Sequence, residues 1–156
     1  MVIERIVSGG QTGVDRAALD FALERHIPCG GWCPSGRRAM DGPIPPHYPL
    51  QETPSRAYSQ RTGWNVRDSD GTLIIGFGGP LSGGTALTLR VAEKQGKPCK
   101  VVSLNLTMDP NCVLNWVLAV GIKTLNVAGP REDADLRVYQ RARNFLRALE
   151  LQPPPL

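Results

Sequence analysis

Short apolar runs that do not alternate with polar residues recur along this chain, and they constrain its fold more than any other feature. Val, Ile and Leu dominate the central runs, which is typical of strands buried on both faces of a sheet. Helical patterns lie between these runs, and Gly96 and Gly121 are stop signals after two of them. The predicted strands are 3–7, 28–32, 72–76, 99–104 and 124–127, and the predicted helices are 14–25, 85–95, 112–120 and 134–149.

This alternation predicts an α/β fold with a doubly wound, mainly parallel, Rossmann-like sheet. The 156 residues and their 41% hydrophobic content fit a single domain, which we place at residues 1–150. Residues 151–156 contain three prolines and are expected to form a frayed tail. Ligands of such sheets bind beyond the carboxyl ends of the strands. We therefore expect a binding site in the loops that follow the strands.

Two glycine-rich loops follow predicted strands and lead into predicted helices: SGGQTGVD at 8–15 and GFGGPLSGGTALT at 76–88. Glycines leave backbone N–H groups uncovered, and helix N-termini attract anions. Both loops therefore predict contacts with a phosphorylated small molecule, and a third loop, VAGPRE at 127–132, is expected to reach the same edge. The candidate ligand-binding residues of the three loops are Gly10, Gln11, Thr12, Gly13, Gly79, Ser82, Gly83, Gly84, Thr85, Gly129 and Arg131.

The first loop has an alternative interpretation as a tight turn between a strand and a helix. In that interpretation Asp15 complements the dipole of the helix and Arg16 is solvated. The second loop is less easily explained in this way, because close packing of a helix on the sheet needs fewer glycines than it contains. Its Ser82 and Thr85 hydroxyls suit both helix capping and ligand contact.

A long loop at residues 33–61 contains six prolines and no clear periodicity, which predicts an ordered binding loop. Arg37 and Arg38 lie in it, close to a predicted turn at 41–43. A guanidinium offers a planar fork that matches phosphate. We predict that at least one of these two arginines closes over the pocket, and the alternative is that both face water.

The charge and composition of the chain restrict the kinds of molecule that it can bind. The net charge of +4 suits an anionic small molecule, but the basic residues form no pattern typical of nucleic-acid binding. The four cysteines form no CxxC pair and no zinc-ligand set, so no metal site is predicted. The sequence contains no run of membrane-spanning length and no secretion signal pattern, so we expect a cytoplasmic protein without membrane contact. Residues 113–120, VLNWVLAV, are apolar on more than one helical face, which predicts a homo-oligomer, either a dimer or a tetramer.

Four blocks in order, SGGQTGVDRAALD, GGWCPSGRRAMDGPIPPHYPLQET, NVRDSDGTLIIGFGGPLSGGTALT and LNVAGPRE, resemble the molybdenum cofactor carrier family. That family is similar to the circularly permuted YpsA-like branch of the SLOG superfamily, relatives of the LOG phosphoribohydrolases. The resemblance runs from about residue 6 to 148 and implies a Rossmann-like fold, an oligomer and a pocket for a phosphorylated pterin or nucleotide. The residues it carries over are 10–13, Asp15, Arg37, Arg38, 82–85 and 129–132.

The LOG nucleotide loop resembles PGGxGTxxE, whose Glu serves in glycosidic cleavage, and Thr88 stands at the corresponding position here. The leading hypothesis is therefore a non-catalytic protein that binds molybdenum cofactor (molybdopterin), or a similar phosphorylated pterin. It would protect this ligand before transfer, with molybdoenzymes or cofactor biosynthesis proteins as partners. The alternatives are a LOG-like nucleoside 5′-monophosphate phosphoribohydrolase, with Asp15, Glu132 or Asp70 supplying the catalytic carboxylate, and a nucleotide-sensing SLOG module. The sequence does not separate pterin from nucleotide.

Overall fold

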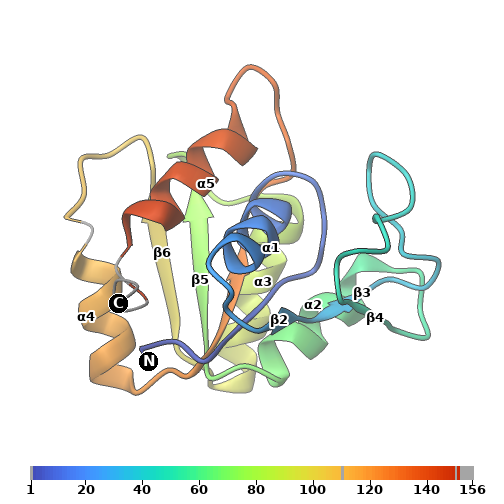
Figure 1. The fold of residues 1–156 in the computed structure, drawn as a ribbon, viewed down its shortest axis with the longest axis horizontal. Helices are drawn as coiled ribbons and strands as arrows, with labels where there is room; N and C mark the ends of the chain where they lie inside the picture. Colours follow the sequence, from blue (N-terminus) through green and yellow to red (C-terminus); the bar gives the residue numbers. More distant parts are fainter. Residues whose placement is uncertain (1, 110, 150, 152–156) are drawn as a thin grey trace.

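The computed structural model describes residues 2–109, 111–149 and 151. A five-stranded sheet crosses the molecule, and helices cover both of its faces (Figure 1). The strand order is β2-β1-β7-β5-β6, and each neighbouring pair is parallel. The strands are β1 (Arg5–Val7), β2 (Cys29–Gly30), β5 (Gly71–Gly76), β6 (Cys99–Ser103) and β7 (Thr124–Ala128). The prediction of a single-domain, Rossmann-like α/β fold is confirmed.

Five helices belong to the described residues, and they divide between the two faces of the sheet. α1 (Val14–Glu24), α4 (Asn111–Val120) and α5 (Val138–Ala148) share one hydrophobic cluster with the sheet. α2 (Tyr58–Arg67) and α3 (Gly83–Gln95) pack against each other on the opposite face. Every residue of β5 is buried. Burial on both sides explains why the central strands read as continuous apolar runs.

The order of the strands decides where the loops meet. From β1 the chain passes through α1 to β2 at one edge, and from β5 it passes through α3 to β6 at the other edge. β7 lies between β1 and β5, at the point where the winding reverses. The loops that follow β1, β5 and β7 therefore converge at a topological switch point, the usual place for a ligand in an open α/β sheet.

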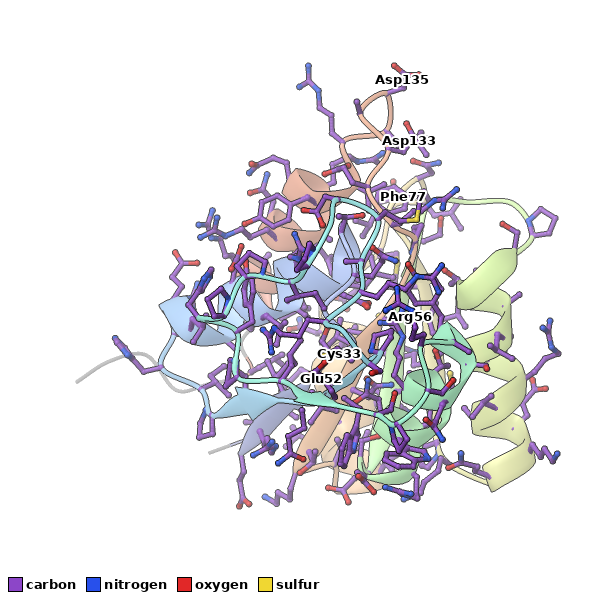
Figure 2. All side chains as sticks on the ribbon, turned by 90° about the vertical axis from the view of Figure 1, so that its right-hand side faces the viewer. Cys33, Glu52, Arg56, Phe77, Asp133 and Asp135 are labelled. Atoms are coloured by element: carbon purple, nitrogen blue, oxygen red, sulfur yellow. The ribbon has the colours of Figure 1, made fainter. Side chains whose placement is uncertain are left out.

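The predicted long loop is partly regular. β3 (Trp32–Cys33) and β4 (Gln51–Glu52) form a small parallel sheet, with Cys33 and Glu52 side by side on the two strands (Figure 2). The loop ends earlier than predicted, because α2 begins at Tyr58. The single predicted strand 28–32 is also split at Gly31, whose φ is +132°.

α2 was missed because its buried face is polar. The helix buries Arg61, Thr62 and Asn65 beside Val66, so no apolar periodicity marks it. Its N-cap residue, Ala57, has no side chain that caps the helix, so no capping box marks its start in the sequence either. Ala57 N–H donates instead to Ser55 Oγ in the preceding turn, at 3.0 Å.

The carboxyl-terminal part departs from prediction at two points. α5 begins at Val138 instead of residue 134, after Arg137, whose φ is +53°. The loop before it, which carries Asp133 and Asp135, protrudes from the molecule (Figure 2). Leu151, placed in the predicted tail, is buried in the core, and Ile3 N–H donates to its carbonyl at 3.3 Å. The rest of that predicted tail, 152–156, lies outside the described residues.

Candidate functional site

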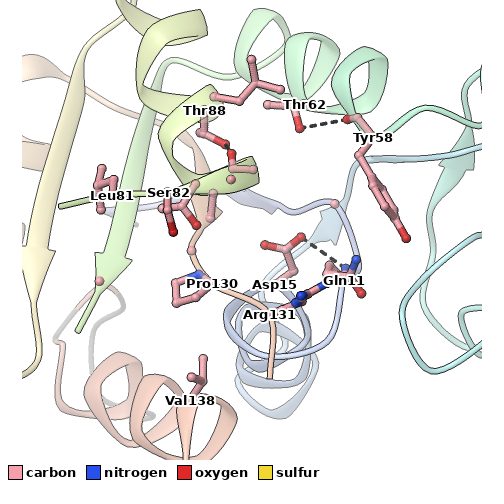
Figure 3. A pocket seen from close by; sticks show the side chains of 18 of the residues that line it. Gln11, Asp15, Tyr58, Thr62, Leu81, Ser82, Thr88, Pro130, Arg131 and Val138 are labelled. Atoms are coloured by element: carbon pink, nitrogen blue, oxygen red, sulfur yellow. Dashed lines mark hydrogen bonds between the residues drawn. The ribbon is translucent and has the colours of Figure 1, made fainter. Parts of the chain in front are cut away.

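A cavity of about 590 Å³ opens at the carboxyl edge of the sheet, where the three loops meet one face of α2 (Figure 3). This volume lies within the usual range for small-molecule sites. Among the residues that the sequence singled out, those that line the cavity are Gln11, Asp15, Ser82, Gly83, Gly84, Thr85, Thr88, Gly129, Pro130, Arg131 and Glu132. Those that do not line it are Gly10, Thr12, Gly13, Arg37, Arg38, Asp70 and Gly79.

The amino-terminal end of α3 is the part of the lining best suited to an anion. Ser82 is the N-cap residue in an extended conformation, and no side chain caps the helix. The first N–H groups of a helix have no partner within the helix, so here they remain available to a ligand. A Cβ built on Gly83 or Gly84 meets nothing within 4 Å. The glycines therefore leave open space beside free donors, as the second loop predicted.

The first glycine-rich loop has a different role from the one predicted. Gln11 N–H donates to Asp15 Oδ2 at 3.2 Å, and Thr12 N–H donates to Gln11 Oε1 at 3.0 Å. Val14 N–H, at the start of α1, donates to the Pro130 carbonyl at 3.2 Å. These donors are engaged within the protein instead of facing the cavity. The loop is a packed turn, close to the alternative that the sequence left open, except that Arg16 is not solvated. Its side chain is 12% exposed and pairs with Asp41 at 2.6 Å.

Two glycines of that turn are explained by close packing. A Cβ on Gly13 would lie 2.5 Å from the Pro130 carbonyl oxygen, against the backbone of the loop after β7. A Cβ on Gly10 would lie 2.5 Å from Leu50 Cδ1, under the long loop. Both positions also have φ above +70°. The turn therefore holds two other loops in place around the cavity.

The two arginines predicted as phosphate clamps are engaged elsewhere, which corrects the prediction. The Arg37 guanidinium donates to four backbone carbonyls between residues 44 and 50, at 2.8–3.3 Å, and so fixes the fold of the long loop. Arg38 donates to the Arg56 carbonyl at 3.0 Å and lies over the Tyr58 ring at 4.6 Å. Neither arginine reaches the cavity.

Arg61 on α2 is the buried cation that the sequence reasoning missed. Its side chain is only 10% exposed and lines the cavity, and its Nη1 donates to the Gly9 carbonyl at 2.7 Å. The same nitrogen lies 3.9 Å from Asp15 Oδ2. Tyr58, Thr62 and Asn65, also on α2, join it in the lining. Since α2 itself was not predicted, none of these four residues was a candidate.

Asp15 is the buried anion of the cavity. Its side chain is 9% exposed and points into the cavity from α1 (Figure 3). Loss of hydration on burial raises the pKa of Asp15 from 3.8 to about 6, and Arg61, the Gln11 N–H and Arg16 only partly offset this. A carboxyl group with such a pKa changes between its protonated and ionised forms close to pH 6.

The other positions considered for a catalytic carboxylate have structural roles. Asp70 does not line the cavity, and its Oδ2 accepts from Thr124 N–H at 2.8 Å. Glu132 accepts hydrogen bonds from Val138 N–H at 3.0 Å and Tyr139 N–H at 3.3 Å, and thus stabilises the amino-terminal end of α5. The Thr88 hydroxyl donates to the Gly84 carbonyl, one turn earlier in α3, at 2.9 Å. Within the described residues, no group of three His, Cys, Asp or Glu side chains is arranged to hold a metal ion. The described helices also include none long and apolar enough to span a membrane.

Together, the parallel sheet and the cavity at its switch point define an α/β protein of the Rossmann-like class with a pocket of small-molecule size. Residues 6–150 match the model of the circularly permutated YpsA SLOG family, and the chain belongs to that family. It is also similar to a crystal structure titled "Putative molybdenum carrier protein" from Syntrophus aciditrophicus SB. The two are 47% identical over 96% of each chain, with a TM-score of 0.90. Curated proteins gave no match.

Proposed function

We propose that this protein is a carrier that binds molybdenum cofactor, or a similar phosphorylated pterin, and shields it before transfer. The observation that carries the proposal is the uncapped, glycine-rich amino-terminal end of α3, which faces a cavity of about 590 Å³. The name of the 47% identical protein supports the choice of ligand. The terminal phosphate binds the free N–H groups of α3 and the Ser82 hydroxyl, and the ring system occupies the rest of the cavity.

We propose a cytoplasmic protein that delivers its ligand to molybdoenzymes or to proteins of cofactor biosynthesis. A homo-oligomer is part of the proposal, because the large apolar side chains Leu118 and Val120 on α4 are 59% and 44% exposed. Burial of this surface against a second copy would remove these side chains from water.

The first test changes the anion-binding end of the cavity with Gly84→Val. The added side chain enters the open space beside the free N–H groups of α3, so we expect affinity for a pterin monophosphate to fall about 10–100-fold. Titration calorimetry measures the affinity. Mass spectrometry and oxidised-pterin fluorescence identify any ligand released from the purified wild-type protein.

Gly63→Val is the matched control. Gly63 is also a helical glycine with open space around it, but it does not line the cavity. Both variants add the same β-branched residue to a helix and carry a similar cost in helix propensity. Equal affinities in the two variants would contradict the assignment of the phosphate to α3.

A LOG-like hydrolase is the second candidate function. It is favoured by Asp15, which lines the cavity and whose raised pKa of about 6 suits a general acid or base. We nevertheless expect binding of nucleoside 5′-monophosphates without release of the base. Thr88 replaces the acid of the LOG pattern, and a general acid or base is typically worth about 10²–10⁴-fold in rate. Chromatography of the free base after incubation measures turnover. Turnover that Asp15→Asn abolishes and Glu132→Gln preserves would assign the protein to the hydrolases.

A further inference from the structure

The negative charge of Asp15 is unfavourable in a cavity that binds nothing but a phosphate group. Its carboxylate is buried to about nine-tenths and points into the cavity, where it would repel a phosphate group. One oxygen, Oδ2, accepts from Gln11 N–H, and the described residues offer Oδ1 no hydrogen bond. This oxygen therefore suits a ligand group that donates hydrogen bonds, and not a phosphate.

Arg61 places donors next to this acceptor. Its guanidinium, also about nine-tenths buried, has five N–H groups, and among the described residues its only hydrogen bond runs from Nη1 to the Gly9 carbonyl. Nη1 and Asp15 Oδ2 are 3.9 Å apart. An acceptor and several donors thus stand side by side in the lining of the cavity. Their free positions face the space that a ligand would fill, so a ligand with matching groups can pair with both residues at once.

We propose that Asp15 and Arg61 bind a 2-amino-4-oxopyrimidine edge, the hydrogen-bonding edge that pterins share with guanine. Arg61 donates to the oxo group, and Asp15 Oδ1 accepts from the ring N–H and the amino group. This inference rests on the proposed function, since it assigns the part of the same cavity that the phosphate does not occupy. Asp15 is then the residue that determines specificity for the ring.

The cost of burying Asp15 agrees with this assignment. Burial raises the pKa of Asp15 to about 6 because Arg61 and the Gln11 N–H compensate only part of the lost hydration. Two N–H donors from a ligand supply the missing compensation. A ribose that offers its hydroxyl groups to Asp15 is the competing occupant, and it would be bound without regard to the base.

The test compares monophosphates that differ only in this edge, at pH 7.5, where the Asp15 carboxylate is ionised. The probes are GMP, which carries the edge; IMP, which lacks the amino group; and XMP, which carries an oxo group in its place. We expect wild-type protein to bind GMP at least 10-fold more tightly than IMP or XMP, the smallest effect of one hydrogen bond to a charged group. Asp15→Asn should remove the preference for GMP and improve the binding of XMP, because an amide N–H can donate to the oxo group.

The gain in XMP binding separates a specificity role from structural damage, which would weaken all probes alike. Equal binding of GMP, IMP and XMP by the wild type would overturn the inference in favour of the ribose, and the proposed function would stand. A failure of all phosphorylated probes to bind would overturn both. A monophosphate of hydroxymethylpterin, measured beside GMP, identifies by its higher or lower affinity whether a pterin or a guanine nucleotide is the source of the edge.

Discussion

Gly13→Ala is expected to destabilise this protein by about 2–6 kcal/mol. The φ of Gly13 is +84° and its ψ is −127°, a conformation that costs a non-glycine residue about 1–3 kcal/mol. The new Cβ would also lie 2.5–2.6 Å from backbone atoms of Pro130, Arg131 and Glu132. Backbone cannot move aside as a flexible side chain does, and overpacking adds about 1–3 kcal/mol. Urea unfolding measures the loss as a lower midpoint at unchanged slope.

Gly96→Ala is the control for this prediction. Gly96 also has a positive φ, of +67°, but a Cβ there meets nothing within 4 Å. Gly96→Ala should therefore lose only the free energy that a positive φ costs an alanine, about 1–2 kcal/mol. If the two variants lose equal stability, the contact between the first loop and the loop after β7 does not contribute as described. If Gly13→Ala keeps wild-type stability but loses ligand affinity, Gly13 would be a ligand-binding residue after all.

Asp15→Asn is expected to stabilise the ligand-free protein by up to about 3 kcal/mol at pH 7.5. The pKa of Asp15 is about 6 in the folded protein and has an ordinary value of 3.8, and one pKa unit corresponds to about 1.4 kcal/mol. Because the folded pKa is the higher one, the folded state holds the proton more tightly, and stability falls as pH rises from about 4 to 6. Asparagine has no charge to bury and avoids this loss.

The size of the gain must therefore depend on pH. At pH 5 it should shrink to about half of its value at pH 7.5, and near pH 3.5 it should vanish. For a chain of 156 residues, 3 kcal/mol corresponds to a melting temperature about 6–12 °C higher. Asp135→Asn, an exposed substitution whose side chain makes no hydrogen bond among the described residues, should stay within about 0.5 kcal/mol of the wild type. A gain for Asp15→Asn that is equal at pH 5 and pH 7.5 would contradict the role of the buried charge.

Together with its predicted loss of ring specificity, this gain would identify Asp15 as a residue kept for binding at the expense of stability. Proteins commonly carry such costs at functional sites. The measurement needs no ligand, so it tests the physical state of Asp15 independently of the ligand's identity.

The sheet and the uncapped, glycine-rich start of α3 were accessible from the sequence, because both depend on local patterns. Buried strands such as β5 are continuous apolar runs, and the loop before α3 contains more glycines than packing requires. The two arginines of the long loop were misassigned for the opposite reason. Their types suit phosphate, but the long loop has few apolar residues and uses Arg37 to satisfy its own carbonyls.

The other end of the cavity was not accessible from local patterns. Arg61 becomes a neighbour of Asp15 only through tertiary packing, across 46 positions of sequence. The helix that carries it turns its polar face inward, which removes the periodicity by which helices are found. Similarly, Gly13 looks like a phosphate-binding glycine until the loop after β7 is placed against it.

The central position of β7 has a consequence for how the protein is made. Before this strand is in place, the sheet consists of two separate halves, β2 with β1 and β5 with β6, and only β7 joins them. The chain emerges from the ribosome in order, so both glycine-rich loops are synthesised well before the strand that brings them together. The cavity is therefore complete only after residues 124–132 have been added, and a nascent chain that stops earlier lacks the third of its converging loops.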